Sequence, residues 1–381
     1  MATENKKYIP ALRFPEFQND GEWKCIIIGN IINTINPPKK LQSSEYKKKG
    51  TFPIVDQSSS YISGYSDDVD AVIDCNGHKY IVFGDHTCSL KLVDFPFIQG
   101  ADGIKIFKSK TPEVLTEYLY QYIFAHPIIS KEYKRHFSDL KEKLLLYSAN
   151  VCEQKKVADC LSSLDNYIDA TKRKLELLKE HKKGLMQRLF PAKGKTTPEI
   201  RFPEFQNDGE WKCVIIGDII STINPPKKLQ SSEYKKKGAF PIVDQSASYI
   251  AGYSDNGDAV IDNNGYNYIV FGDHTCSLKL IDFPFIQGAD GIKIFKSKIT
   301  KVLTEYLYQY IFAHPINSKE YKRHFSDLKE KLLLYPTKAC EQKKIADCLS
   351  SLDNYIDATK RKLELLKEHK KGLMQQLFPK L

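Results

Sequence analysis

The chain has 381 residues, of which 41% are hydrophobic and 27% charged, a composition typical of globular rather than disordered proteins. Lysine and arginine exceed aspartate and glutamate by 57 − 47 = 10, so nucleic acid is a compatible partner, although charge alone does not identify one. No apolar run approaches the ~20 residues that span a bilayer, and the first ten residues lack the apolar segment of a secretory signal, so a cytoplasmic location is expected.

The sequence repeats itself. Residues 13–190 align with residues 201–378 at a constant offset of 188, and only 22 of the 178 aligned pairs differ. A repeat of this length indicates a duplicated domain rather than a solenoid. Gene duplication without functional meaning is one interpretation, but the order of motifs inside each half favours a functional one.

Each half opens with RFPEFQNDGEWK and continues with short β-rich segments. In the first half these are CIIIGNII, TFPIVDQ, DAVIDCNG, KYIVFGD, LKLVDFPFI and GIKIF. From Leu115 to Tyr147 the pattern becomes helical, with a break expected near Pro127. Lys131, Lys134, Arg135 and His136 are expected on a solvated helix face. The fold class is therefore α+β, with two similar mixed α/β domains over residues 1–150 and 201–338.

A long helix is predicted to follow each globule, over residues 151–190 and 339–381, with residues 191–200 as a linker. An amphipathic helix packed on its own domain is one interpretation, but about 38 residues exceed what a small domain can cover, so the two copies are expected to form an intramolecular coiled coil. The apolar stripe, interrupted by Thr171 and Lys182, consists of Val157, Leu161, Leu164, Ile168, Leu175, Leu178, Leu185 and Leu189, and in the second copy of Ile345, Leu349, Leu352, Ile356, Leu363, Leu366, Leu373 and Leu377.

The linker predicts the direction of this pairing. Ten residues reach at most ~35 Å, so the second globule is expected near the far end of the first helix. The helices would then be antiparallel, with the globules related by an approximate two-fold axis. Two like modules in that arrangement match two inverted half-sites on duplex DNA. A helix of ~57 Å sets an upper limit of ~16 base pairs between them.

The segment INPPKKLQSSEYKKKG occurs unchanged at residues 35–50 and 223–238. Lysines in a loop of this kind can meet phosphates, and Gln, Ser and Tyr can contact phosphates or base edges. A weaker alternative is that Asn36 begins a catalytic tetrapeptide like those of amino-methyltransferases. Such tetrapeptides end in an aromatic residue that stacks on the flipped base, but here Lys39 stands at that position. The predicted DNA-binding residues here are Lys39, Lys40, Gln42, Ser43, Lys47, Lys48 and Lys49, with Lys227, Lys228, Gln230, Ser231, Lys235, Lys236 and Lys237.

Other polar loops add candidates. Asp85 and His86 could form an acid–base pair, but no nucleophile or metal cluster accompanies them, so DNA contact or a structural hydrogen bond is favoured and the choice between these two stays open. No catalytic residue, metal or cofactor is expected. The candidates for DNA binding are Gln57, Ser58, Tyr61, His86, Thr87, Ser89, Lys91 and Lys105, with Gln245, Ser246, Tyr249, His274, Thr275, Ser277, Lys279 and Lys293.

Taken together, the chain resembles the specificity subunits of type I restriction–modification systems. The resemblance lies in LRFPEF and EWK at the start of the chain, FGDHTCSLKLVDFPFIQGADGIKIF inside the globule, and EQKKIADCLSSLDNYIDATKRKLELLKEHKKGLMQQLFP at the end. It implies two target recognition domains that each read half of a split double-stranded DNA site. It also implies helical regions that bind two methyltransferase subunits and, through the complex, restriction subunits; the catalytic motifs would belong to those partners.

One departure from the family pattern affects the target. Members generally carry two different recognition domains, whereas these halves are nearly the same, so we expect a palindromic split site. The differences Cys75/Asn263, His78/Tyr266, Lys79/Asn267, Asp68/Asn256 and Val69/Gly257 cluster in one region, which could make the half-sites differ at one position. A repressor-like DNA-binding protein without enzymatic partners is the alternative function.

Overall fold

The computed structural model describes residues 7–128, 134–289, 291–316 and 323–380. Contacts divide the chain into two compact units, one made of residues 1–172 and 361–381 and the other of residues 173–360. Each unit combines one repeated globule with one part of each long helix. The two units contain corresponding strands and helices in the same order, as the sequence repeat predicts.

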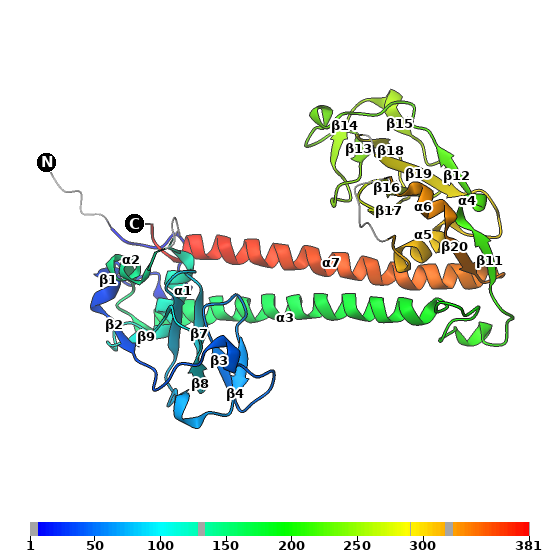
Figure 1. Ribbon diagram of the computed structural model, residues 1–381. Coiled ribbons are helices and arrows are strands. Elements are labelled where there is room, and N and C mark those ends of the chain that lie inside the picture. The colour runs from blue at the N-terminus through cyan, green and yellow to red at the C-terminus, as the bar shows by residue number, and fades with distance from the viewer. Residues whose placement is uncertain (1–6, 129–133, 290, 317–322, 381) are drawn as a thin grey trace. The chain divides into compact units, whose positions relative to one another are not determined.

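Two four-stranded sheets form the globule of the first unit (Figure 1). The first is antiparallel in the order β2 (Ile32–Ile35), β9 (Ile104–Ser109), β6 (Tyr80–Gly84) and β7 (Leu90–Val93). The second has the order β4 (Gly64–Ser66), β3 (Phe52–Val55), β8 (Phe97–Gln99) and β5 (Val72–Ile73), with β3 and β8 parallel. A separate antiparallel pair joins β1 (Lys24–Ile27) to β10 (Leu144–Tyr147).

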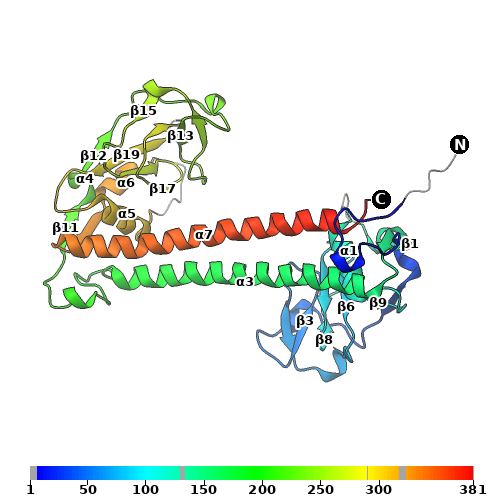
Figure 2. The ribbon, with the colours of Figure 1, turned by 180° about the vertical axis from the view of Figure 1, so that it is seen from behind.

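Strand β6 lies at the centre of this globule. All five of its residues are buried, because successive side chains point to opposite faces and both faces are covered. Ile81 and Phe83 pack in the cluster that includes helix α1 (Thr116–Ala125), whereas Tyr80 and Val82 pack with residues of the second sheet. The first sheet is therefore sandwiched between α1 and the second sheet, and Figure 2 shows this unit from behind.

The second unit repeats this plan. Its first sheet has the order β12 (Ile220–Ile223), β19 (Ile292–Ser297), β16 (Tyr268–Gly272) and β17 (Leu278–Ile281). Its second sheet has the order β14 (Gly252–Ser254), β13 (Phe240–Val243), β18 (Phe285–Gln287) and β15 (Val260–Ile261). The separate pair consists of β11 (Lys212–Ile215) and β20 (Leu332–Tyr335). The helices of this globule are α4 (Ile216–Ile219), α5 (Thr304–Ala313) and α6 (Phe325–Glu330). The prediction of two similar domains, each with sheets and helices, is confirmed.

The helix predicted up to Tyr147 is wrong in its last part. Helix α1 ends at Ala125, before Pro127, and a short helix α2 (Phe137–Glu142) precedes strand β10. The segment Leu144–Tyr147 is a strand because it pairs with β1, whose position in the sequence is far earlier. His136 is fully buried rather than solvated, with Nδ1 3.1 Å from Asp139 Oδ2. Lys131 lies outside the described residues.

The long helices are α3 (Val151–Leu189) and α7 (Ala339–Leu377), each of 39 residues. In the first unit Val157, Leu161 and Leu377 share one buried cluster, and Lys370 of α7 pairs with Asp165 of α3. In the second unit Leu189, Ile345 and Leu349 share a cluster, and Lys182 of α3 pairs with Asp353 of α7. These pairings run in opposite directions along the two helices, so α3 and α7 are antiparallel, as predicted. None of the described helices is long and apolar enough to cross a bilayer.

The residues that interrupt the apolar stripe are themselves buried. Thr171 is 6% exposed and donates from Oγ1 to the Tyr167 carbonyl at 2.8 Å, while Lys182 is 4% exposed. Thr359 and Lys370 occupy the same positions in α7 and are buried to the same extent. The interruptions therefore do not break the stripe, because hydrogen bonds satisfy their polar groups.

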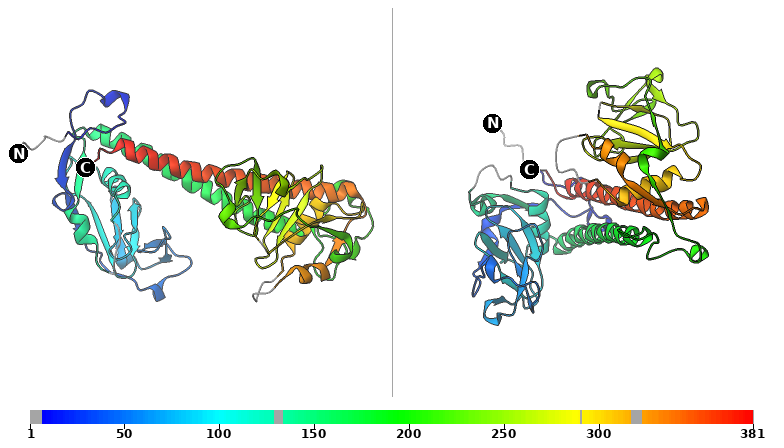
Figure 3. Two further views of the ribbon diagram at one scale, coloured as in Figure 1. Left: turned by 90° about the horizontal axis from the view of Figure 1, so that it is seen from above. Right: turned by 45° about the vertical axis from the view of Figure 1, so that its right-hand side comes forward.

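The start of each long helix is fixed to its globule by polar side chains. Arg13 donates from Nε and Nη2 to the two carboxylate oxygens of Glu153, at 2.7 and 2.8 Å, and both side chains are buried. Gln154 accepts the Leu115 N–H at 3.0 Å and donates to the Glu113 and Ser148 carbonyls. The segment before the globule also donates a hydrogen bond from the Leu12 N–H to the Gln376 carbonyl; Figure 3 shows it in blue beside the red end of α7.

A candidate nucleic-acid interface

The lysine-rich loop connects β2 to β3 in the first globule. One apolar side chain anchors it, since Leu41 is 2% exposed and packs with Ile54, Ala71 and Ile98 of the second sheet. Two isolated β-bridges, Lys40 to Gln99 and Lys47 to Tyr65, fix its backbone. The loop is therefore held at defined points while its lysine side chains stay exposed.

Aspartates of the same globule neutralise three of its five lysines. Lys39 Nζ lies 2.6 Å from Asp68 Oδ2, Lys40 Nζ lies 3.1 Å from Asp102 Oδ1, and Lys47 Nζ lies 2.9 Å from Asp67 Oδ2. The hydrogen bond from Lys47 and those from Thr51 lower the pKa of Asp67 to about 2. The lysine cluster is thus less positive than the sequence alone indicates.

The second globule differs at one of these pairs. Asn256 stands where the first globule has Asp68, and it has no carboxylate to offer Lys227. Lys235 keeps its partner, with Nζ 2.8 Å from Asp255 Oδ2. Among the described residues no ion pair involves Lys227, so this loop carries one more unneutralised positive charge than its counterpart.

The predicted DNA contacts of Lys91 and Lys279 require correction. Lys91 is 6% exposed, and its ammonium group donates to the Asp56 and Ser60 carbonyls at 2.6 and 2.5 Å. Lys279 makes the same two bonds, to the Asp244 and Ser248 carbonyls. Because this charge is buried and its donors are used, each lysine supports the polar loop above it instead of reaching toward a ligand.

That polar loop contains Gln57, Ser58 and Tyr61. Ser58 is exposed, and its backbone N–H donates to Asp56 Oδ1 at 2.9 Å. The Tyr61 hydroxyl donates to the Leu92 carbonyl, so that hydroxyl is already used, while the residue as a whole is 47% exposed. Tyr249 is placed in the same way. The exposed ring face, rather than the hydroxyl, is what these tyrosines offer to a ligand.

The turn after β6 holds Asp85 in a structural role. Its backbone carbonyl accepts the His136 N–H and its Oδ1 accepts the Phe137 N–H, both at 2.8 Å. Asp85 therefore fixes the start of α2, and the hypothesis that it forms an acid–base pair with His86 is not supported. His86 is half-buried at the next position, with Nδ1 3.2 Å from the Lys134 carbonyl.

Hydrogen bonds bring three of the predicted loops together. Thr87 Oγ1 donates to the Gln57 carbonyl at 3.2 Å, and Gln57 Nε2 donates to the Asp102 carbonyl at 3.3 Å. Gly84 is required at the centre, because a Cβ there would lie 2.3 Å from Thr87 Oγ1. Gly103 has φ of 85°, a conformation that favours glycine. Gln57, His86 and Thr87 thus form one polar surface with the loop that precedes Lys105.

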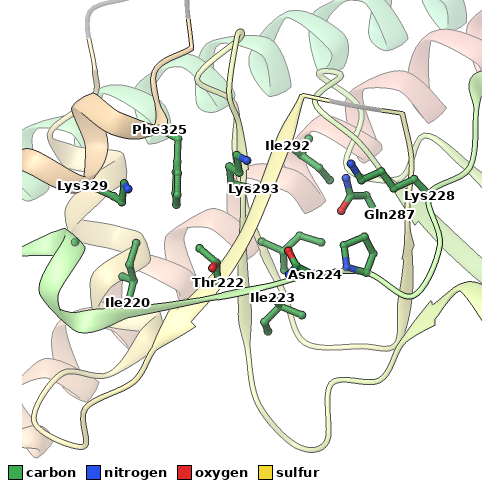
Figure 4. A pocket seen from close by; sticks show the side chains of 13 residues that line it. Ile220, Thr222, Ile223, Asn224, Lys228, Gln287, Ile292, Lys293, Phe325 and Lys329 are labelled. Atoms are coloured by element: carbon green, nitrogen blue, oxygen red, sulfur yellow. The ribbon is translucent and has the colours of Figure 1, made fainter.

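A pocket of about 430 Å³ adjoins the lysine-rich loop of the second unit (Figure 4). Asn224 and Pro225 of that loop form one wall, and the side chains of Lys228, Lys293 and Lys329 surround the opening. Gln287, at the end of β18, is 3% exposed and contributes to the lining. All thirteen lining residues are identical at the corresponding positions of the first half.

Comparison with known proteins agrees with this architecture. A sequence model described as the type I restriction modification DNA specificity domain matches residues 208–368, and the repeat places its counterpart at residues 20–180. The chain is 24% identical over 430 aligned positions to the type I restriction enzyme MjaVIII specificity subunit of Methanocaldococcus jannaschii, covering 98% of this chain and 95% of that one. The chain thus carries a type I restriction modification DNA specificity domain at residues 208–368 and is similar to a specificity subunit along nearly its whole length.

Two further relatives support the same assignment. A putative type I restriction enzyme MjaX specificity subunit of M. jannaschii is 27% identical over 250 residues, which is 59% of this chain, and the match spans only 56% of that protein. The crystal structure of a type I restriction–modification S subunit from M. genitalium superposes with a TM-score of 0.74 at 17% identity, covering 98% of this chain and 99% of that one. This superposition shows the fold of a specificity subunit along nearly the whole chain.

The clustered differences between the two halves of the chain have structural consequences. Cys75 donates from Sγ to the Phe95 carbonyl at 3.0 Å, whereas Asn263 donates from Nδ2 to the Asp282 carbonyl at 2.7 Å. Lys79 lies 3.7 Å from Glu117, whereas Asn267 donates a hydrogen bond to Glu305. Each version of this turn is therefore satisfied by its own neighbours.

Part of the candidate site was not predicted from the sequence. Lys141 and Lys329 fall on short helices that were predicted as part of one long helix, and Gln99 and Gln287 end apolar strands. The sequence signal that could have identified Gln99 and Gln287 is that each is the single polar residue at the end of the apolar run FPFIQ. Within the described ranges no three His, Cys, Asp or Glu side chains are grouped so as to hold a metal ion.

Proposed function

We propose that this protein is the DNA-recognition subunit of a type I restriction–modification complex and has no catalytic activity of its own. Each recognition domain would bind one half of a split double-stranded DNA site. The match of residues 208–368 to the specificity-domain model, together with the near identity of the two domains, is the observation that carries the proposal. A cytoplasmic location goes with this function.

The candidate contacts divide into two kinds. The exposed lysines of the two INPPKK loops would meet phosphates, which position the protein without reading sequence. The surface formed by Gln57, His86 and Thr87, with Gln245, His274 and Thr275 in the second domain, would face the base edges, because amide and hydroxyl groups can both donate and accept there. Lys91 and Lys279 would act as supports of this surface.

The near identity of the domains leads to a palindromic target. Gln57, Ser58, His86, Thr87 and Ser89 are all matched by the same residue types in the second half. Two like surfaces on one chain would read two like half-sites in inverted order. The turn that differs between the halves remains the place where the half-sites could differ.

The paired helices would serve as the spacer and as the dock for two methyltransferase subunits. The MjaVIII relative is named as the specificity subunit of a type I restriction enzyme. Methylation and cleavage would therefore be supplied by partner methyltransferase and restriction subunits.

Copurification tests this proposal against the alternative of a repressor-like protein without partners. The tagged full chain would be expressed in its native cells, and the eluate analysed by mass spectrometry and by methyl transfer to genomic DNA. A methyltransferase in stable stoichiometry, together with transfer activity, is expected. A chain that binds one DNA sequence tightly but elutes alone, without transfer activity, would favour the repressor.

A further inference from the structure

We propose that each recognition domain holds one phosphate of the DNA backbone in a pocket beside the INPPKK loop. In the second domain the phosphate would bind in the pocket lined by Lys293, Lys329 and Gln287. In the first domain Lys105, Lys141 and Gln99 take these positions. The inference rests on the proposed DNA-binding function. It assigns a backbone phosphate of the DNA to the pocket of each domain.

The first argument is that two lysines of each domain flank one aromatic ring of the pocket. In the first domain Lys105 Nζ lies 6.0 Å and Lys141 Nζ 5.6 Å from the centroid of the Phe137 ring. The two ammonium groups are therefore at most 6.0 + 5.6 = 11.6 Å apart. In the second domain Lys329 Nζ lies 5.8 Å from the Phe325 centroid, and Figure 4 shows Lys293 on the other side of that ring.

The second argument is that no carboxylate in the described part of the chain neutralises these charges. Among the described residues, no carboxylate forms an ion pair with Lys105, Lys141, Lys293 or Lys329. By contrast, Lys39, Lys40 and Lys47 of the adjoining loop each have an aspartate partner. Each pocket therefore holds two lysines without a described carboxylate partner, and a bound anion would neutralise their charge.

The third argument is the amide in the lining. Gln287 is 3% exposed and lines the pocket, and its side chain makes no hydrogen bond to any residue that the structure describes. Its two N–H donors are therefore available to an acceptor bound in the pocket. Phosphate oxygens are acceptors only, and they suit both this amide and the lysines.

The size and position of the pocket fit this ligand. Its volume of about 430 Å³ is far larger than the ~30 Å³ of one water molecule, which leaves room for a phosphodiester group. Thr222 and Asn224 add a hydroxyl and an amide to the wall opposite the lysines (Figure 4). Because Asn224 begins the INPPKK loop, a DNA strand held here would continue onto the exposed lysines of that loop.

The test uses the full chain purified with its methyltransferase, and two duplexes of equal length, one with the methylated target and one of random sequence. The variant is Lys105→Ala, Lys141→Ala, Lys293→Ala and Lys329→Ala. Its matched control is Lys24→Ala, Lys110→Ala, Lys212→Ala and Lys298→Ala, which removes four exposed lysines of the same domains outside the pockets. All side chains changed are exposed, so equal thermal unfolding is the check on folding.

The pocket variant should lose affinity for both duplexes by the same factor. Its slope of log K against log salt concentration should be shallower than that of the wild type by about 0.9 for each pocket. The control should lose less slope than the pocket variant. Equal slopes for the pocket variant and the wild type, with the target still preferred, would overturn the pocket assignment alone; a wild-type complex that does not prefer the target would overturn the proposed function.

A chemical change in the DNA gives an independent readout. Neutral methylphosphonates would be placed one at a time along each half-site. The wild-type complex should lose affinity at one backbone position per half-site, and the pocket variant should show no further loss at that same position. Losses of equal size for both proteins at every position would contradict the proposal.

Discussion

Lys182 of α3 and Asp353 of α7 form a short ion pair in the second unit, with Nζ 2.5 Å from Oδ1. The other carboxylate oxygen of Asp353 accepts a hydrogen bond from Gln309 Nε2 of α5 at 3.2 Å. One carboxylate therefore links both long helices to a helix of the recognition domain. Lys370, Asp165 and Gln121 repeat this arrangement in the first unit. A polar group in an apolar stripe fixes the register of a helix pair, because a shifted register would leave it unsatisfied.

Removal of the Asp353 carboxylate should destabilise the second unit. Asp353→Ala would leave the buried Lys182 ammonium without a counter-charge, and we expect the free energy of unfolding to fall by about 1–3 kcal/mol. Hydrogen exchange in α3 and α7, with thermal unfolding, is the measurement. Asp357→Ala, one turn later on an exposed position, should have little effect. Equal losses in the two variants would mean that the ion pair does not hold the helices together.

The buried pair between Arg13 and Glu153 predicts a local effect. Glu153 is 1% exposed, so Glu153→Ala should cost about 3 kcal/mol in the first unit, because the Arg13 guanidinium would lose both of its carboxylate bonds. Hydrogen exchange should increase at the start of α3 and at residues 13–21. Arg201 and Glu341 form the same pair in the second unit and serve as an internal control. Uniform loosening of both units would contradict this local role.

Two half-buried histidines predict acid sensitivity. Burial lowers the pKa of His126 and of His314, and each ring stacks on a tyrosine of its own helix. Because the pKa is lower in the folded state than the 6.5 of the unfolded chain, the unfolded state binds protons first as pH falls. The contribution of these histidines to the free energy of unfolding is therefore fully present above pH ~6.5. It declines below that pH by up to about 1.4 kcal/mol per pH unit for each histidine.

The matching experiment compares unfolding at pH 7 and at pH 5.5. His126→Phe with His314→Phe keeps an aromatic ring and removes the titration, so this variant should lose less stability between the two pH values than the wild type. His181→Gln with His369→Gln, on exposed positions of the long helices, should behave like the wild type. Parallel losses in all three proteins would exclude His126 and His314 as the source.

The difference between Asp68 and Asn256 predicts unequal phosphate binding by the two loops. Asp68→Asn should release Lys39 and strengthen binding to duplex DNA of any sequence, by about two- to tenfold at low salt, with the salt slope steeper by about 0.9. The reciprocal Asn256→Asp should weaken binding in the same manner. Fluorescence anisotropy over a salt series measures both variants. Changes of the same sign in the two variants would show that residue 39 and residue 227 do not meet DNA.

The sequence predicts best the features that depend on neighbouring residues. The long helices follow from an apolar stripe with helical spacing, and their observed bounds, Val151–Leu189 and Ala339–Leu377, lie within those expected. The strand Leu144–Tyr147 could not be found in this way, because the partner that makes it a strand is β1, more than a hundred residues earlier.

The candidate site shows the same distinction. Lys91 looks like an exposed lysine in the sequence, yet its amine is buried by carbonyls of Asp56 and Ser60, which lie 35 and 31 residues away. The pocket is likewise assembled from β12, the INPPKK loop, β18, β19 and α6. Composition identified a basic loop, but only the fold reveals which positive charges are neutralised and which remain available.

The most direct test of the account is a genome-wide map of methylated bases after co-expression of this chain with its methyltransferase. Two inverted copies of one short sequence, separated by a fixed unread spacer, are the predicted result. A chain in which residues 201–338 are replaced by the recognition domain of an unrelated specificity subunit should change one half of that motif and leave the other intact. A single uninterrupted motif, or a motif that changes in both halves, would contradict the claim that each domain reads its own half-site.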